Sequence, residues 1–187
     1  MNDTQLLNEN NCLLVIIDIQ QRLVAAMPSD IVAEVIKKNQ LLLIAAKALA
    51  MPVIVTEQYP KGLGSIVAEL KDQFNADTTI IEKTSFSCTN VTEFSQKVDN
   101  SKRKKIILTG MEAHICVLQT ALALQAQNFQ VYVVEDAVCS RSQFNQNNAI
   151  QRLRDAGVIM TNVESVIFEW LGDARHPKFK ELSKLIV

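Results

Sequence analysis

Three side chains of different chemistry follow short apolar runs of the sequence. Asp18 ends the run in VIIDIQ, Lys83 ends the run in IIEKTSF, and Cys116 comes shortly after the run KIILT. A carboxylate and an ammonium at the ends of apolar segments are costly to bury without partners. We therefore expect these groups to meet in the folded protein, although they are far apart along the chain.

A carboxylate, an ammonium and a thiol in contact would form a nucleophilic set. A free thiol has a pKa of about 8.5, and a helix amino terminus or a nearby ammonium favours its thiolate form. An adjacent carboxylate can accept the thiol proton. We predict that Cys116 is the nucleophile, Asp18 the general base and later the general acid, and Lys83 the electrostatic support. Backbone N–H groups at the start of the following helix could hold an oxyanion.

The elements that would position these residues alternate between strands and helices. Short apolar runs predict strands at Cys12–Asp18, Val53–Thr56, Thr79–Lys83, Lys105–Thr109, Val131–Glu135 and Val158–Thr161. Helical spacing predicts a helix that Asp30 caps, further helices around Ile66–Phe74, Val91–Val98, Ile115–Gln127 and Gln146–Ala156, and two shorter helices in the tail. This alternation indicates an α/β fold in which helices cover both faces of a parallel sheet. Ligands of such sheets bind outside the carboxyl ends of the strands.

Length and charge restrict the function classes. The 187 residues fit one domain, 1–187, and the formal net charge is −1. This charge predicts neither a nucleic-acid partner nor a membrane-binding patch, and the basic cluster KRKK at 102–105 is expected to be solvated. The four cysteines form no C-x-x-C pair, and no basic leader precedes an apolar segment. These features predict a cytoplasmic protein with free thiols.

No cofactor is expected from the sequence. The two histidines, His114 and His176, lie far apart, which argues against a zinc site. The segment KGLGS contains Gly62 and Gly64 but forms no dinucleotide fingerprint, and no phosphate-binding G-x-x-x-x-G-K motif occurs.

Four segments together resemble the cysteine hydrolases of the isochorismatase-like superfamily. They are the D-x-Q of Asp18 and Gln20, the lysine of EKTSFS, the segment GMEAHICV and the segment EDAVCSR, and the similarity runs from about Leu13 to Val166. The resemblance implies a three-layer αβα fold with a six-stranded parallel sheet and a triad of Asp18, Lys83 and Cys116. It also implies a non-proline cis peptide bond at Met111–Glu112.

Two departures from relatives refine the expected reaction. Nicotinamidase-like members carry an aspartate and histidines near the second strand that bind a metal, whereas VIVTEQYPKGLGS contains no histidine and offers only Glu57. We therefore predict no required metal and disfavour nicotinamide as the substrate. True isochorismatases generally lack the nucleophilic cysteine. Its presence here predicts that a small molecule is hydrolysed at an amide C–N or similar acyl bond through a thioester intermediate.

Further residues are candidates for the substrate and oxyanion region. Gln20 is expected to orient Asp18 or to bind the substrate, while Tyr59 and Phe86 either line the pocket or pack beneath a loop. The remaining candidates belong to the segment around the nucleophile and are Met111, Glu112 and Ile115. His114 is disfavoured as the base because side chains two residues apart on a helix point in nearly opposite directions.

The residues of the EDAVCSR segment are expected to give structural support. Asp136 is expected to hold the backbone near Cys116, and Arg141 to pair with an acidic group. Cys12 is expected in the core, and Cys88 and Cys139 in loops.

Alternative functions and the assembly state remain open from sequence alone. The same fold could serve binding or assembly with vestigial chemistry, or Cys116 could act as a reversible redox sensor. We expect a homo-oligomer, for which the apolar segments Val166–Leu171 and Leu182–Val187 are the sequence hint. The same segments could equally complete the core.

Overall fold

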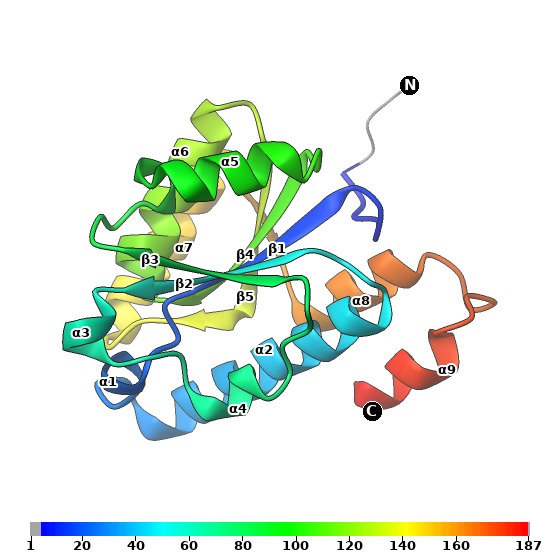
Figure 1. The fold of residues 1–187 in the computed structure, drawn as a ribbon, viewed down its shortest axis with the longest axis horizontal. Coiled ribbons are helices and arrows are strands. Elements are labelled where there is room, and N and C mark those ends of the chain that lie inside the picture. The colour runs from blue at the N-terminus through cyan, green and yellow to red at the C-terminus, as the bar shows by residue number, and fades with distance from the viewer. Residues whose placement is uncertain (1–4, 187) are drawn as a thin grey trace.

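The computed structural model describes residues 5–186 and contains a six-stranded, all-parallel sheet (Figure 1). The strand order is β3-β2-β1-β4-β5-β6. The strands are β1 (Cys12–Ile17), β2 (Val53–Gln58), β3 (Thr78–Lys83), β4 (Lys105–Met111), β5 (Gln130–Cys139) and β6 (Ile159–Thr161). All six predicted strands are present, and the predicted α/β fold class is confirmed.

Helices cover both faces of the sheet, as the strand–helix alternation requires (Figure 1). The helices are α1 (Gln21–Val24), α2 (Ser29–Ala48), α3 (Pro60–Leu63), α4 (Ala68–Lys71), α5 (Thr92–Asn100), α6 (Leu118–Ala126), α7 (Gln143–Asp155), α8 (Val163–Leu171) and α9 (Phe179–Leu182). Helices α2, α4, α8 and α9 pack on one face, and α5, α6 and α7 on the other. The molecule therefore has the three layers that the family resemblance implied.

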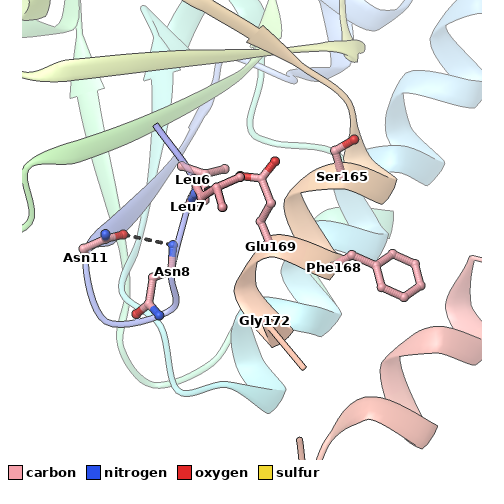
Figure 2. Close-up of a pocket in the computed structure, with 8 residues that line it drawn as sticks. All are labelled: Leu6, Leu7, Asn8, Asn11, Ser165, Phe168, Glu169 and Gly172. Carbon is pink, nitrogen blue, oxygen red and sulfur yellow. Dashed lines mark hydrogen bonds between the residues drawn. The ribbon is translucent and has the colours of Figure 1, made fainter. Parts of the chain in front are cut away.

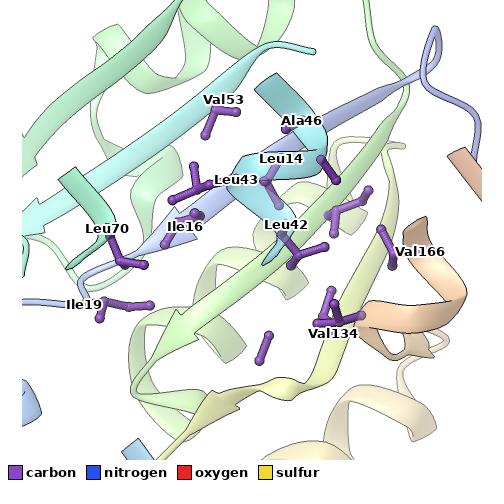
Figure 3. Packing of buried hydrophobic residues seen from close by; sticks show 14 of the residues in the cluster. Leu14, Ile16, Ile19, Leu42, Leu43, Ala46, Val53, Leu70, Val134 and Val166 are labelled. Atoms are coloured by element: carbon purple, nitrogen blue, oxygen red, sulfur yellow. The ribbon is translucent and has the colours of Figure 1, made fainter. Parts of the chain in front are cut away.

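The central strands alternate their side chains between two hydrophobic cores. Leu14 and Ile16 of β1 face the core beneath α2 and α8, where Leu42 and Val166 meet them (Figure 3). The intervening residues, such as Val15, face the core beneath α5, α6 and α7. Because both faces of β1 and β4 are buried, both strands are almost continuously apolar.

Two expected features of the helices differ in the structure. Helix α2 begins at Ser29, so Asp30 lies in its first turn, and no side chain caps the helix at Pro28. The expectation that Asp30 is the cap is therefore wrong, although its charge still lies near the positive end of the helix dipole. The helix expected around Ile66–Phe74 contains only the four residues of α4.

The tail segments complete the core. Val166, Ile167, Trp170 and Leu171 of α8 are buried, as is Leu182 of α9, whereas Val187 lies outside the described residues. Most of the apolar side chains of these segments therefore belong to the core, whereas Phe168 is 40% exposed.

The basic cluster at 102–105 is not solvated throughout. Lys105 at the start of β4 is buried, and its Nζ donates a 2.8 Å hydrogen bond to the backbone oxygen of Leu6. The sequence pattern missed this contact because it depends on the N-terminal segment, almost one hundred positions away.

Strand β4 approaches β1 very closely at Gly110. This glycine has φ +104°, and a Cβ there would lie 2.0 Å from the backbone oxygen of Ile17. Only glycine combines this positive φ with the absence of a side chain. The close approach brings the carboxyl end of β4 directly beside Asp18, which follows Ile17.

Candidate active site

Asp18 lies immediately beyond β1 at the carboxyl end of the sheet and is fully buried. Its backbone has φ 53°, a left-handed conformation that aspartate adopts more readily than most residues. Thr56 at the end of β2 donates a 2.7 Å hydrogen bond from Oγ1 to Asp18 Oδ1. The strand end and this hydroxyl together fix the direction of the carboxylate.

Lys83 ends β3 and joins the other two members of the predicted set. Its Nζ lies 2.6 Å from Asp18 Oδ2 and 3.5 Å from Cys116 Sγ, and both side chains of the ion pair are fully buried. The ammonium also donates a 2.7 Å hydrogen bond to Gln58 Oε1. The expected convergence of carboxylate, ammonium and thiol is present in the structure.

Cys116 lies in a π-helical turn, Ala113–Val117, between β4 and α6. The helix expected from Ile115 therefore begins as a widened turn, and α6 itself starts at Leu118. Such turns occur frequently at functional sites. The residue is only 6% exposed, and its thiol contacts the same Lys83 ammonium as the Asp18 carboxylate.

Burial works against the thiolate form of Cys116, which the nearby ammonium was expected to favour. Burial, and secondly the charge of Asp18, raise the pKa of Cys116 more than the Lys83 ammonium lowers it. The protein therefore holds a neutral thiol next to a base, and Asp18 is placed to take the thiol proton.

Burial favours proton acceptance by Asp18 and outweighs the ion pair with Lys83. Burial raises the pKa of the Asp18 carboxyl, even though Lys83 and Thr56 act in the opposite direction. Burial is the largest single influence and opposes the Lys83 ammonium, but the charge and hydrogen bond of Asp18, together with the neighbouring thiols, outweigh it and raise the pKa of Lys83. The carboxylate is thus a stronger base than in water, and Lys83 stays charged beside it.

Gln20 supports the neighbouring strand rather than the Asp18 carboxylate. Its side chain is fully buried; Nε2 donates to the backbone oxygens of Gln58 and Gly64, and Oε1 accepts from the Gln58 N–H at 2.7 Å. The amide of Gln20 therefore clamps the end of β2 to the loop that precedes α4.

The two aromatic candidates are both exposed. Tyr59 is 54% exposed and Phe86 is 53% exposed. Tyr59 lines a cavity of about 630 Å³ together with Pro60, Ser85 and Val91, beside the β3 edge of the sheet.

The segment before the nucleophile contains the implied cis peptide bond between Met111 and Glu112. Met111 is buried and Ile115 is half-buried. The Glu112 carboxylate accepts hydrogen bonds from the backbone N–H of Arg141 at 3.0 Å and from its guanidinium at 2.5 Å. Burial alone would raise the pKa of Glu112, but these Arg141 contacts outweigh it and lower that pKa. The expected acidic partner of Arg141 is therefore Glu112.

His114 does not contact the nucleophile. Its Nδ1 lies 2.9 Å from Ser140 Oγ, and its Nε2 lies 3.4 Å from Asn145 Nδ2. Since an amide nitrogen only donates, Nε2 is the acceptor and Nδ1 carries the hydrogen. The histidine joins the β4–α6 turn to the β5–α7 segment.

The expectation that Asp136 holds the backbone near Cys116 is wrong. Its Oδ1 accepts from the backbone N–H of Val163 at 2.9 Å, and its Oδ2 lies 3.4 Å from Lys38 Nζ. It instead fixes the start of α8 to the sheet.

The other cysteines are also buried and free. Cys12 is in the core, as expected. Cys139 closes β5 and is not in a loop, because β5 extends beyond Glu135 after a register shift against β4. Burial raises the pKa values of Cys12 and Cys88 to about 11 and that of Cys139 to about 12, so these thiols are protonated at neutral pH.

The described residues contain no group of three or more histidine, cysteine, aspartate or glutamate side chains arranged to hold a metal ion. The Glu57 carboxylate accepts a 2.7 Å hydrogen bond from the Ile66 N–H and lies 4.0 Å from Lys71 Nζ.

Across residues 5–186, no helix is both long and apolar enough to span a bilayer.

A second cavity, of about 700 Å³, is lined by residues of the N-terminal segment and of α8 with its C-terminal end. Figure 2 shows these lining residues. Asn11, which lines it, directly precedes β1, whereas Asp18 follows β1. This cavity is therefore at the opposite end of the sheet, between the N-terminal segment and α8.

Sequence reasoning missed two residues that contact the reactive groups. Thr56 was placed inside a strand, and Gln58 was not considered, yet they bind Asp18 and Lys83 respectively. Their positions at the carboxyl end of β2, next to β1 in the sheet, are the signal that would have identified them.

Comparison with known proteins agrees with this architecture. A family model described as the isochorismatase domain matches residues 12–165. Isochorismatase domain-containing protein 2 of Xenopus laevis is 39% identical over 183 residues, which is 97% of this chain and 86% of that protein.

Two solved structures share the fold over nearly the whole chain. A structure described as MAR1 ribonuclease from Caenorhabditis elegans has a TM-score of 0.91 and 39% identity, and the match covers 96% of this chain and 91% of that one. The YcaC gene product of Escherichia coli, described as an octameric hydrolase of unknown specificity, has a TM-score of 0.90 and 25% identity, with coverage of 100% and 91%. The chain therefore belongs to the isochorismatase family of the isochorismatase-like hydrolase superfamily.

Proposed function

We propose that this protein is a metal-independent cysteine hydrolase that cleaves a small molecule at an amide C–N or similar acyl bond. The observation that carries the proposal is the position of Lys83 Nζ, which contacts both Asp18 Oδ2 and Cys116 Sγ inside a buried site. Glu57, the one metal-ligand candidate near β2, already binds the Ile66 N–H and lies beside Lys71. This occupation supports catalysis without a metal.

The first half of the reaction acylates Cys116. Asp18 accepts the thiol proton as the sulfur attacks the acyl carbon, and the carbonyl π electrons move to oxygen to form a tetrahedral intermediate. Lys83 stabilises the developing negative charge on sulfur. The intermediate then collapses, the C–N bond breaks, and Asp18 returns its proton to the leaving nitrogen.

The second half releases the product. Asp18 is again a carboxylate and removes a proton from a water molecule, which attacks the thioester carbon. Collapse of the second tetrahedral intermediate breaks the C–S bond and forms the carboxylic acid. The sulfur leaves beside the Lys83 ammonium and regains the proton from Asp18. Positioned proton transfer of this kind typically contributes about 10²–10⁴-fold to the rate.

RNA is the competing substrate, because the similar Caenorhabditis elegans protein is described as a ribonuclease. Two observations favour the acyl substrate for this chain. The net charge of −1 offers little attraction for a phosphate backbone. In addition, His114 is held by Ser140 and Asn145 away from the nucleophile, so it does not supply a second base beside Cys116. We therefore propose a small-molecule substrate and include RNA in the test.

We also propose that the protein assembles as a homo-oligomer in the cytoplasm. The octameric description of the similar Escherichia coli protein supports assembly. Phe86 and Phe144, which are 53% and 77% exposed, supply apolar surface for a subunit contact. The four free cysteines fit a reducing compartment. Light scattering of the purified protein would test assembly, and a monomer at all concentrations would contradict it.

The test of the proposed function is a screen of small amides, esters and an unstructured RNA, compared between wild type and Cys116→Ala. Cys139→Ala is the matched control, since it removes another buried thiol, whose charged neighbour is Glu112 rather than Asp18 or Lys83. Hydrolysis of an acyl substrate that only Cys116→Ala abolishes supports the proposal. RNA cleavage without acyl hydrolysis, or activity that survives Cys116→Ala, would contradict it.

A further inference from the structure

The ammonium of Lys83 has three hydrogens to donate and four acceptors within reach. Two of them are close: Asp18 Oδ2 at 2.6 Å and Gln58 Oε1 at 2.7 Å. The other two acceptors are more distant: the backbone oxygen of Ser85 lies at 3.4 Å and Cys116 Sγ at 3.5 Å. These two compete for the third hydrogen of the ammonium. With two hydrogens held by Asp18 and Gln58, the third is directed toward the sulfur and its neighbour.

Gln58 is placed for this contact by the sheet itself. In the parallel pairing of β2 and β3, Gln58 is the register partner of Lys83, so their side chains emerge next to each other. Its amide nitrogen donates to the backbone oxygen of Thr84 at 2.7 Å. Because the nitrogen is engaged there, the amide oxygen is the atom that faces Lys83.

The backbone of Gln58 is itself held from the other side. The buried amide of Gln20 accepts from the Gln58 N–H and donates to the Gln58 carbonyl. Gln20 stands in the same D-x-Q segment as Asp18, so one short segment supplies the base and fixes the strand end that carries Gln58. Lys83 is thus oriented from two directions, by Asp18 on β1 and by Gln58 on β2.

We propose that Gln58 is a positioning residue, which holds Lys83 as an ammonium and directs its remaining N–H group at the sulfur of Cys116, and that Gln20 acts through it. This inference rests on the proposed role of Cys116 as the nucleophile. Gln58 touches neither Cys116 nor any reacting atom, so its effect reaches the thiol through Lys83.

The test measures the rate at which iodoacetamide alkylates Cys116, followed by peptide mass spectrometry over a range of pH. Gln58→Met keeps a side chain of similar length but removes the acceptor for Lys83. The ammonium loses a partner and its third N–H is no longer aimed at sulfur, so less thiolate forms. We expect alkylation about tenfold slower than in wild type at each pH, which corresponds to one pKa unit.

The matched control is Gln146→Met. Gln146 is also half-buried, and its amide reaches only the backbone oxygen of Val138, at 3.4 Å. This variant should alkylate at the wild-type rate. Gln58→Asn is the second test variant, because it keeps an amide but shortens the side chain by one methylene, and it should also be slowed.

Three results would overturn the inference. The first is wild-type alkylation in a folded Gln58→Met or Gln58→Asn protein. The second is an equal slowing in Gln146→Met. The third is failure of both Gln58 variants to fold, which would make Gln58 a residue of the fold. Alkylation needs no substrate, so these results are distinct from a failure of the proposed hydrolysis, which would appear as a negative substrate screen.

Discussion

Lys83 Nζ lies 2.6 Å from Asp18 Oδ2, although 65 positions separate the two residues along the chain. Both side chains are fully buried. A buried ion pair contributes little net stability unless its geometry is good, yet removing one partner leaves a costly isolated charge. The pair is therefore better explained by what it does to the third group in contact, the thiol of Cys116.

The first prediction concerns the charge of Asp18. Burial first and the Asp18 carboxylate second raise the pKa of Cys116, while Lys83 lowers it. Asp18→Asn removes the second cause and leaves Lys83, so the pKa of Cys116 should fall. We expect faster alkylation of Cys116 near neutral pH together with a loss of turnover of about 10²–10⁴-fold, because the base is missing. Slower alkylation in this variant would contradict the arrangement.

The second prediction concerns the loss of Lys83. Lys83→Met leaves the Asp18 carboxylate buried without its cation, which typically costs about 3–5 kcal/mol of unfolding free energy. Denaturant unfolding near neutral pH would measure this loss. The double variant Asp18→Asn/Lys83→Met removes both charges and should recover much of the stability. A double variant no more stable than Lys83→Met would show that the ion pair is not the origin of the loss.

The third prediction concerns the close approach of β4 to β1. Gly110→Ala would place a Cβ 2.0 Å from the Ile17 backbone oxygen at φ +104°. Strained backbone and overpacking together should cost roughly 2–6 kcal/mol of unfolding free energy. The control is Gly157→Ala, where φ is +86° but the nearest atom is the flexible end of Gln125 at 3.2 Å. Equal losses in the two variants would contradict the role assigned to this contact.

The fourth prediction concerns Glu112 and acid. Its contacts with Arg141 lower its pKa from the ordinary value of 4.5 in the folded protein. A group whose pKa is lowered on folding contributes stability above its unfolded pKa and loses it as the pH falls through the folded pKa. Glu112→Gln should therefore be less stable than wild type by about 1 kcal/mol near neutral pH, discounted because Arg141 is largely exposed. The difference in unfolding free energy between wild type and Glu112→Gln should become smaller below pH 4.5.

Urea unfolding of both proteins across this pH range is the measurement. Asp173→Asn, which breaks an exposed ion pair with Arg175, should show almost no such dependence. A stability difference for Glu112→Gln that grows in acid would have the wrong sign for this account.

The sequence predicted the convergence of Asp18, Lys83 and Cys116 better than it predicted their surroundings. Asp18 and Lys83 end apolar strands of a parallel sheet, and the rule that ligands bind at the carboxyl ends of such strands was sufficient to group them with Cys116. That rule was not sufficient to predict that Thr56 contacts Asp18 and that Gln58 contacts Lys83. Their contacts follow from the pairing of Ile17 with Thr56 and of Gln58 with Lys83. The register of such a pairing depends on both strands, so the sequence of one strand does not predict it.

The remaining differences have long-range causes. Lys105 is buried because the N-terminal segment supplies a backbone acceptor for it. Strand β5 extends to Cys139 because its register against β4 shifts between Leu108 and Gly110. The neutral resting state of Cys116 depends on burial, which outweighs the nearby ammonium. Local sequence patterns contain none of these contacts.

The most direct measurement is the intact mass of the protein during turnover of an acyl substrate, with the modified peptide identified after rapid acid quench. We predict a transient mass increase equal to the acyl group, located on Cys116, that is absent in Cys116→Ala. Substrate hydrolysis with no acyl adduct on Cys116 at any time, or with the adduct on another residue, would contradict it.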